Sequence, residues 1–336
     1  MNLIDVTKKF ATPEACNDFI ETMRWPDGVV CPACESKRVT KYQTQEGTRN
    51  RINSKTGKNE VKTVPARILY VCLDCELKFS VTTGTLFNDT HLDLEKWFMA
   101  VALMVNAKKG ISALQMKRDL KVAYKTAWYL NHRIRKAMEL IELADDQPLS
   151  GTVEVDETYI GGKFDKRRKC QRWDKEPVFG MVQRGGKAKT YHVPQINRFH
   201  VIDKMKDNIA IDTDLVCTDE SAMYKRMPAS VQKHEIVNHS AKEWVRGDVH
   251  TGTIDGYWGL LKHGVIGSFH QISIKHLHRY LSEFQFRWNN REAQEIFMLV
   301  IAALVIWSAV PYRKLIEPLP GEEATGPEVS LDDEPF

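Results

Sequence analysis

The chain has 336 residues, of which 43% are hydrophobic and 27% charged, and this composition excludes an intrinsically disordered chain. The net charge of +4 does not by itself indicate a nucleic-acid partner. The N-terminal residues lack the apolar stretch of a secretory signal, and the longest apolar run, 296–307, is too short to span a bilayer. We therefore predict a cytoplasmic protein of two or three domains, with reduced thiols and no membrane partner.

The charges are unevenly distributed along the chain. Residues 108–136 contain nine Lys or Arg and one acid, and residues 163–175 contain seven basic residues and two acids. The stretch 317–336 contains seven acids and no base, which predicts a disordered acidic tail. A single basic run is often only a solvated surface, but basic zones also attract phosphate backbones. Because both basic runs lie beside the motifs below, we interpret them as DNA-facing zones.

Residues 1–28 are predicted to form a helical lead-in, and residues 29–90 a zinc ribbon. The ribbon prediction rests on two CxxC motifs, whose thiols are Cys31, Cys34, Cys72 and Cys75. Each motif can place two thiolates on one tetrahedral Zn²⁺, and paired CxxC motifs favour zinc over redox-active cysteines. Four thiolates leave no open position, so the site should be structural. The polar insert at 41–63 is expected to be a hairpin.

Residues 91–144 are predicted to be a helical DNA-binding domain. Within them, Ser112–Leu120 and Ala123–Ala137 resemble a helix-turn-helix, although many plain helical hairpins have the same pattern. The basic residues of the second helix make it a candidate for reading a DNA groove. The candidate DNA contacts on this helix are Lys125, His132, Arg133 and Arg135.

Residues 150–316 change to a pattern of alternating strands and helices. Strands are expected at 152–160, 177–183, 189–193, 214–218 and 234–237. Helices are expected at 199–208, near 221–225, at 254–263 and at 274–288. This order is that of a ribonuclease-H-like fold, a mixed sheet flanked by helices. The chain as a whole is therefore predicted to be a multidomain α/β protein.

Three acidic residues are placed to converge at one end of this sheet. Asp156 lies within the first strand, Asp219 follows the fourth strand, and Asp255 begins a helix. Carboxylates brought together repel one another, and a divalent cation offsets this repulsion. Oxygen ligands suit Mg²⁺ or Mn²⁺, and two such ions can flank a phosphodiester during cleavage. We therefore predict a magnesium site that acts on a phosphodiester.

Basic and aromatic residues accompany the third carboxylate. Lys262 follows Asp255 by two helical turns, so both face the same side, and a basic residue there can grip a phosphate. Further candidate DNA contacts around this helix are His250, Tyr257 and Trp258, although a lone histidine is more often structural. The candidates in the second basic zone are Lys163, Arg167 and Arg168.

From about residue 14 to 316, the chain resembles the bacterial insertion-sequence transposases that carry a zinc ribbon before a DDE-type catalytic domain. The resemblance rests on CPAC, CLDC, VEVDETYIGG, CTDESAMY, HTGTIDGYWGLLKHGVIGSFH and similar segments. It implies cleavage at terminal inverted repeats and strand transfer to target DNA, by a homodimer or larger assembly on double-stranded DNA. It also implies metal ligation by Asp156, Asp219 and Asp255, and a catalytic role for Lys262.

Two positions depart from the family's pattern. The family usually has Glu where this chain has Asp255, and Asn where it has Gly252. Aspartate is one methylene shorter, and ligand geometry at a magnesium site is exacting. A catalytically decayed or non-catalytic DNA-binding protein of the same ancestry is therefore an alternative. A nuclease or resolvase on the same fold, which cleaves without joining ends, is a third.

Overall fold

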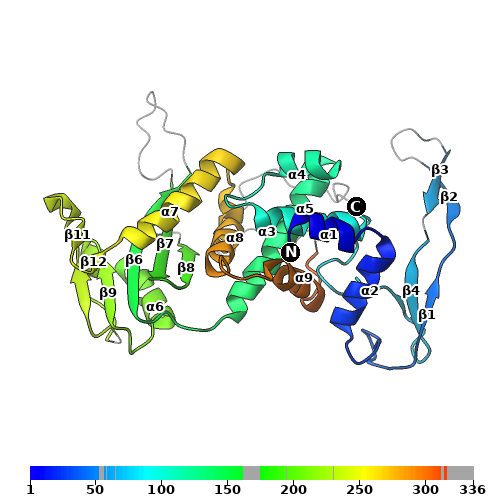
Figure 1. Cartoon of the computed structure of the whole chain (residues 1–336), viewed down its shortest axis with the longest axis horizontal. Coiled ribbons are helices and arrows are strands. Elements are labelled where there is room, and N and C mark those ends of the chain that lie inside the picture. Colours follow the sequence, from blue (N-terminus) through cyan, green and yellow to red (C-terminus); the bar gives the residue numbers. More distant parts are fainter. Residues whose placement is uncertain are drawn as a thin grey trace. The chain divides into compact units, whose positions relative to one another are not determined.

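A computed structural model describes residues 1–52, 57, 59–64, 66–161, 175–193, 195–229, 231–311 and 314–315 (Figure 1). The chain forms two compact units. Unit 1 contains Met1–Ala102 and Ile301–Val310, and unit 2 contains Leu103–Val300 and the described residues after 310. The boundary falls within two helices, α3 (Leu94–Asn106) and α9 (Ile296–Ile306). The finer domain boundaries expected within each unit stay predictions.

Two helices open unit 1, in the region where the sequence predicts a helical lead-in. α1 (Leu3–Lys9) begins with a capping box between Asn2 and Asp5. α2 (Pro13–Arg24) begins after Thr12, whose hydroxyl accepts a hydrogen bond from the amide of Ala15. Proline at the first helical position of α2 suits a helix start, because its missing amide would have no partner there.

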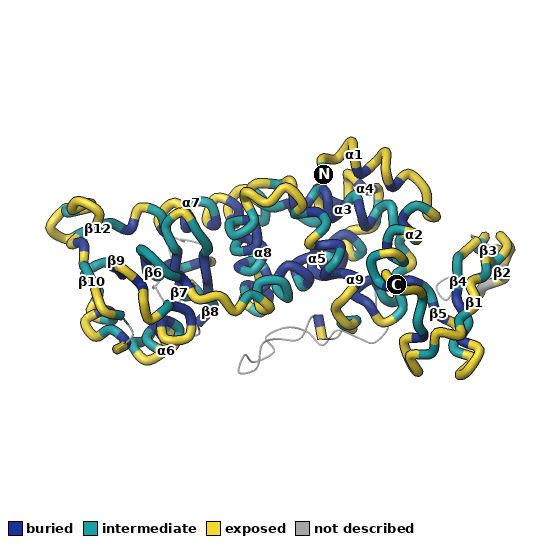
Figure 2. The backbone as a smooth tube through the Cα atoms, turned by 60° about the horizontal axis from the view of Figure 1, so that its bottom comes forward, coloured by how far each residue is buried: buried dark blue, intermediate teal, exposed yellow. Residues whose placement is uncertain are grey.

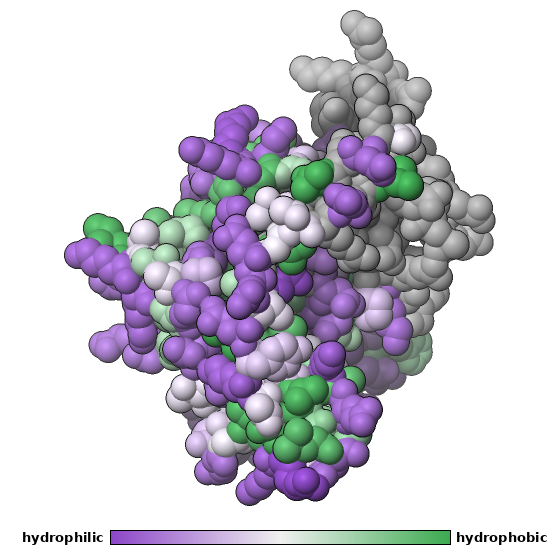
Figure 3. Space-filling model, turned by 90° about the vertical axis from the view of Figure 1, so that its right-hand side faces the viewer, coloured by the Kyte–Doolittle hydropathy of each residue, from purple (hydrophilic) through white to green (hydrophobic). Residues whose placement is uncertain are grey.

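A small antiparallel sheet and a separate hairpin follow. β1 (Val39–Gln43), β4 (Ile68–Cys72) and β5 (Lys78–Phe79) pair in the order β1-β4-β5. β2 (Gly47–Ile52) and β3 (Asn59–Val64) pair only with each other, which confirms the expected hairpin. Seen from the side on which β1–β4 lie in Figure 1, the surface is mostly hydrophilic with scattered hydrophobic residues (Figure 3).

The first helices of unit 2 form the expected helix-turn-helix pair. α4 (Ala113–Leu120) is capped by the hydroxyl of Ser112, and the chain turns at Lys121, which is left-handed with φ 53°. α5 (Tyr124–Ala144) continues beyond the predicted end at residue 137. It extends because its later turns pack against α8 (Leu277–Asn289), and Figure 2 shows much of α5 buried.

A five-stranded mixed sheet forms the rest of unit 2. Its strands are β6 (Thr152–Ile160), β7 (Glu176–Gln183), β8 (Ala188–His192), β9 (Leu215–Thr218) and β10 (His234–Ile236). Their order is β10-β9-β6-β7-β8, with β6, β7 and β8 antiparallel and β9 and β10 parallel to β6. A central first strand with this mixture of directions is the predicted ribonuclease-H-like arrangement.

Helical layers cover both faces of the sheet. α7 (Gly252–Gly264) and α8 pack on the face that bears Ile160 and Val178, whereas α6 (Arg198–Asn208) and the short helix η2 (Ala222–Lys225) pack on the face that bears Val155 and Phe179. Alternation along β6 therefore directs even-numbered side chains from Glu154 to Ile160 toward α7. Residue 156 lies on that inner face.

A second hairpin, which the sequence does not predict, precedes α7. β11 (Val245–Arg246) pairs with β12 (Val249–His250), and two-residue strands are too short to show alternation. This hairpin is mainly exposed in Figure 2. The turns η4 (Val265–Phe269) and η5 (Ile274–His276) link α7 to α8. In the described part of the chain, no helix combines the length and apolar character needed to cross a membrane.

Candidate active site and zinc site

The structure brings the four predicted zinc ligands together. The Sγ atoms all lie within 4.8 Å of one another in this group of Cys31, Cys34, Cys72 and Cys75. The Sγ–Sγ distance is 3.6 Å for Cys31–Cys75 and 3.6 Å for Cys34–Cys72. Four sulfurs about 2.3 Å from one tetrahedral ion lie about 3.8 Å apart, so this cluster fits a single Zn²⁺. The set leaves no ligand position for water, which makes the site structural.

Each knuckle is shaped by a turn with one strained residue. Glu35 and Glu76 directly follow the second cysteine of their motifs and have φ values of 58° and 61°. Their amides donate to the carbonyls of Cys31 and Cys72, over 2.9 and 3.0 Å. Asp74 of the second knuckle accepts from Ser36 and Arg38, each at 2.5 Å. These contacts within and between the knuckles pre-arrange the thiols for one ion.

Asp156 is held in place by its neighbours on β7 and α7. The indole Nε1–H of Trp258 donates to its Oδ2 over 2.9 Å. Gly180 lies opposite Asp156 in the β6–β7 register, and a Cβ built there would lie 2.5 Å from the Trp258 ring. Only glycine at position 180 therefore leaves room for the indole that orients this carboxylate.

Asp156 and Asp219 are close enough for their charges to interact. Burial first, and then the negative charges of Glu157 and Asp219, raise the pKa of Asp156 to about 7. Asp219 follows the last residue of β9, and its Oδ1 accepts a hydrogen bond from the Ser221 amide over 2.9 Å. A divalent cation would relieve the unfavourable charge of these two carboxylates, so the donor set fits Mg²⁺ or Mn²⁺.

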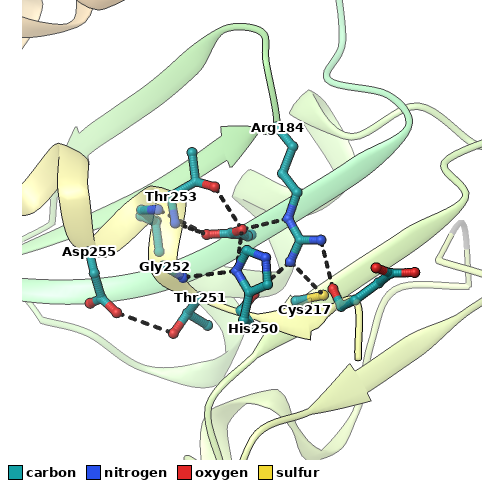
Figure 4. A network of polar contacts seen from close by, with 10 residues as sticks. Arg184, Cys217, His250, Thr251, Gly252, Thr253 and Asp255 are labelled. Carbon is teal, nitrogen blue, oxygen red and sulfur yellow. Dashed lines mark hydrogen bonds and ion pairs between the residues drawn. The ribbon is translucent and has the colours of Figure 1, made fainter. Parts of the chain in front are cut away.

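Asp255 occupies the first turn of α7. Its Oδ2 accepts a hydrogen bond from the Thr251 hydroxyl over 3.4 Å (Figure 4). Within the described ranges, the cysteine set is the one group of three or more candidate metal ligands whose donor atoms all lie within 4.8 Å. The three carboxylates are therefore not gathered that closely, and the triad stays a prediction.

Lys262 lies on the exposed side of the same helix. Together with Thr158, Tyr159 and His270 it lines an open cavity of about 1090 Å³ beside the C-terminal end of β6. A cation at the edge of such a cavity can contact a phosphate group that enters from solvent.

Comparisons with known proteins agree with this geometry. The model of the ISXO2-like transposase domain matches residues 148–289, and the model of the transposase zinc-ribbon domain matches residues 11–77. The chain is 26% identical over 305 residues to an "Uncharacterized protein in transposable element ISH50" from Halobacterium salinarum (strain ATCC 700922 / JCM 11081 / NRC-1). The match covers 83% of this chain and 92% of that protein. The chain therefore has the zinc-ribbon domain and the ISXO2-like DDE domain of insertion-sequence transposases.

In this transposase, three of the DNA contacts predicted on α5 are wrong. His132, Arg133 and Arg135 are all buried, and Arg135 Nε pairs with Glu283 at 2.6 Å. Arg135 lies three residues before the core residue Met138, so helical spacing already places it on the inner side. Lys125, in the first turn of α5, is exposed and stays a candidate for DNA contact.

Two aromatic DNA candidates on α7 are also wrong. Tyr257 and Trp258 are buried in the core between this helix and the sheet. Their spacing from Ile254 and Leu261 is that of an inward helix face, which was the available signal. His250 is partly exposed and remains a candidate. The candidates Lys163, Arg167 and Arg168 and the tail at 317–336 lie outside the described residues.

Sequence reasoning missed two polar residues at the centre of the catalytic domain. Glu154 is fully buried, and Arg184 Nε donates to its Oε1 over 2.6 Å. Glu154 also accepts from the amides of Thr253 and Ile254 over 2.7 and 2.9 Å. An acid between two buried valines on the inward-facing side of a strand was the only local sign, because the partners are distant in sequence.

Proposed function

We propose that this transposase binds the terminal inverted repeats of its insertion sequence, cleaves DNA there, and transfers the new 3′ ends to target DNA. The main support is the pair Asp156, on β6, and Asp219, directly after the neighbouring strand β9 of the matched domain. Asp156 is buried, and a divalent cation would relieve its repulsion with Asp219. A catalytic carboxylate site is expected to have such a perturbed group.

Asp156, Asp219 and Asp255 are the residues that would hold Mg²⁺ or Mn²⁺. When bound, two such ions supply the charge that activates the attacking oxygen and stabilises the leaving oxygen of phosphodiester displacement. The residues of the chain prepare this site. The hydrogen bond from Trp258 to Oδ2 fixes the orientation of the Asp156 carboxylate, and the hydrogen bond from the Ser221 amide fixes that of Asp219. Lys262, which lines the open cavity beside β6, is the residue that we propose holds the phosphate beside the scissile bond.

The proposal is tested with the purified chain, Mg²⁺, and DNA that carries the terminal repeats of the element. We expect nicking at the repeat ends followed by strand joining. Asp156→Ala and Asp219→Ala should each abolish both reactions while DNA binding is kept. Cleavage by either variant at the wild-type rate would contradict the assignment of the site. Because two DNA ends must be brought together, we further propose that a dimer or larger assembly forms on DNA.

A second candidate, a DNA-binding protein whose catalytic site has decayed, is favoured by the position of Asp255. Its carboxylate accepts a hydrogen bond from Thr251, and in the described part of the chain it does not form a set with Asp156 and Asp219 whose donor atoms all lie within 4.8 Å. Asp255→Glu adds the methylene needed to reach further toward Asp156. If the wild-type chain binds the repeats without cleaving them and Asp255→Glu restores cleavage, the protein is a DNA-binding protein with a decayed catalytic site. If the wild-type chain cleaves and the substitution changes little, it is not.

A further inference from the structure

Arg184 and Glu154 form one polar cluster with the segment that leads into α7 (Figure 4). Arg184 follows the last residue of β7, and its guanidinium donates to Glu154 and to the carbonyls of Asp248 and His250, over 2.6, 2.6 and 2.9 Å. It also contacts the sulfur of Cys217 on β9 at 3.8 Å. This cluster, which we call the 154–184 clamp, joins β6, β7, β9 and the start of α7.

Glu154 acts as the N-terminal cap of a helix to which it does not belong. The N-cap residue of α7, Thr251, makes no side-chain capping bond. Glu154 Oε2 instead accepts from the amides of Thr253 and Ile254, and Oε1 accepts from the Thr253 hydroxyl over 2.9 Å. A carboxylate at a helix N-terminus satisfies free amides and interacts favourably with the helix dipole. The strand therefore fixes the position of the helix start.

Three residues of the clamp each lie two residues before one of the three carboxylates. Glu154 lies two residues before Asp156, Cys217 two residues before Asp219, and Thr253 two residues before Asp255. Glu154 and Cys217 are also paired in the β6–β9 register. On a strand, residues two apart share a face and are separated by about 6.6 Å. This spacing applies to Glu154 and Asp156 on β6, whereas Thr253 and Asp255 share the first turn of α7, so a displacement of the helix start moves both.

We infer that Glu154 and Arg184 are positioning residues, which set the spacing of Asp156, Asp219 and Asp255 and thereby the affinity of the site for a divalent cation. This inference rests on the proposed function of the three carboxylates. Outer-shell groups orient the ligands of a metal ion without binding the ion. Their loss commonly lowers metal affinity or activity about 10- to 100-fold. The clamp can have this effect because its hydrogen bonds join β6, which carries Asp156, to the start of α7, which carries Asp255.

The test compares Arg184→Met with a matched control, Glu283→Gln. Glu283 and Arg135 form another buried Glu–Arg pair with an N–O distance of 2.6 Å, but they join α8 to α5, and within the described residues neither forms a hydrogen bond or ion pair with Asp156, Asp219 or Asp255. The full, zinc-loaded chain is titrated with Mn²⁺, and binding is followed by electron paramagnetic resonance. The Mn²⁺ binding that is lost in Asp156→Asn is assigned to the carboxylate site.

Arg184→Met should weaken Mn²⁺ binding about 10- to 100-fold and raise the Mg²⁺ concentration for half-maximal DNA cleavage in parallel. Glu283→Gln should lower thermal stability and leave both quantities unchanged. Thr253→Val, which removes a single bond to Glu154, should shift Mn²⁺ binding in the same direction by less, and it keeps the test open if Arg184→Met does not fold.

Two outcomes separate failure of this inference from failure of the proposed function. If the wild-type chain binds no Mn²⁺ that depends on Asp156, the carboxylate site itself is wrong. If the wild-type chain binds Mn²⁺ at Asp156 and both Arg184→Met and Thr253→Val bind it equally well, the positioning role is overturned. Equal shifts in Glu283→Gln and Arg184→Met would likewise overturn it, since they would reflect general loss of stability.

Discussion

Gly180 shows how one missing side chain can shape a catalytic site. It faces Asp156 across the β6–β7 pair, and the Trp258 ring occupies the space where a Cβ would stand. Trp258 in turn donates to Asp156. At the scale of single residues, the candidate site is therefore a contact chain from a glycine through an indole to a carboxylate.

Gly180→Ala should force the indole away from the sheet and break its bond to Asp156. Overpacking of this kind destabilises a core by about 1–3 kcal/mol. We expect urea unfolding to show this decrease in the free energy of unfolding, and we expect slower DNA cleavage. Gly259→Ala on α7 is the control, because no atom lies within 4 Å of a Cβ built there. Equal stability and activity of Gly180→Ala and the wild-type chain would show that the close contact is not restrictive.

At the scale of elements, α5 and α8 meet at a group of buried and half-buried histidines. Burial, followed by the charge of Arg279, lowers the pKa of His276 to about 3 and that of His278 to about 4. Burial followed by the charge of Arg135 lowers the pKa of His132 well below its usual range. His132 and His276 contact each other, with ring centroids 4.7 Å apart. The folded state thus holds these rings neutral.

These histidines should make the protein sensitive to acid. In the unfolded chain they titrate near pH 6.5, so below that pH the unfolded state binds more protons than the folded state. The free energy of unfolding should therefore fall as the pH drops from about 6.5 toward 4, by up to about 1.4 kcal/mol per pH unit for each histidine. Thermal unfolding between pH 7.5 and 4.5 measures this slope.

His276→Gln should make the slope shallower, whereas His200→Gln, at an exposed position on α6, should leave it unchanged. A slope that is the same in the wild-type chain and His276→Gln would mean that this ring does not control acid stability.

Elements with a strong local pattern were predictable from the sequence, and features made by distant contacts were not. Alternation around Asp156 predicted β6, and the strand order predicted the sheet. Arg135 was predicted to contact DNA because it lies in a basic run, but it is buried on the inner face of α5. The cap on α7 could not be predicted, since its carboxylate, Glu154, is supplied from 99 residues earlier in the chain.

At the scale of the whole molecule, the zinc ligands and the carboxylates belong to different compact units. The four cysteines lie in unit 1, and Asp156, Asp219 and Asp255 lie in unit 2. Structural zinc contributes directly to the folding free energy of its own domain. Loss of zinc should therefore act on unit 1 first.

Cys31→Ser should lose its zinc and unfold the zinc-ribbon region while the domain at 150–316 stays folded. Zinc content per chain and limited proteolysis measure the two effects. Cys16→Ala, which removes a buried thiol outside the cluster, should retain the metal. One zinc ion per chain in Cys31→Ser would show that the ligand assignment is wrong.

We propose that Asp156 and Asp219 form the metal-dependent cleavage site of an insertion-sequence transposase. The single-turnover rate of Mg²⁺-dependent cleavage of terminal-repeat DNA, measured for the wild-type chain and for Asp156→Asn together with their DNA affinity, tests this most directly. We expect cleavage by the wild-type chain, none by Asp156→Asn, and equal DNA affinity. Cleavage by Asp156→Asn at the wild-type rate would contradict it.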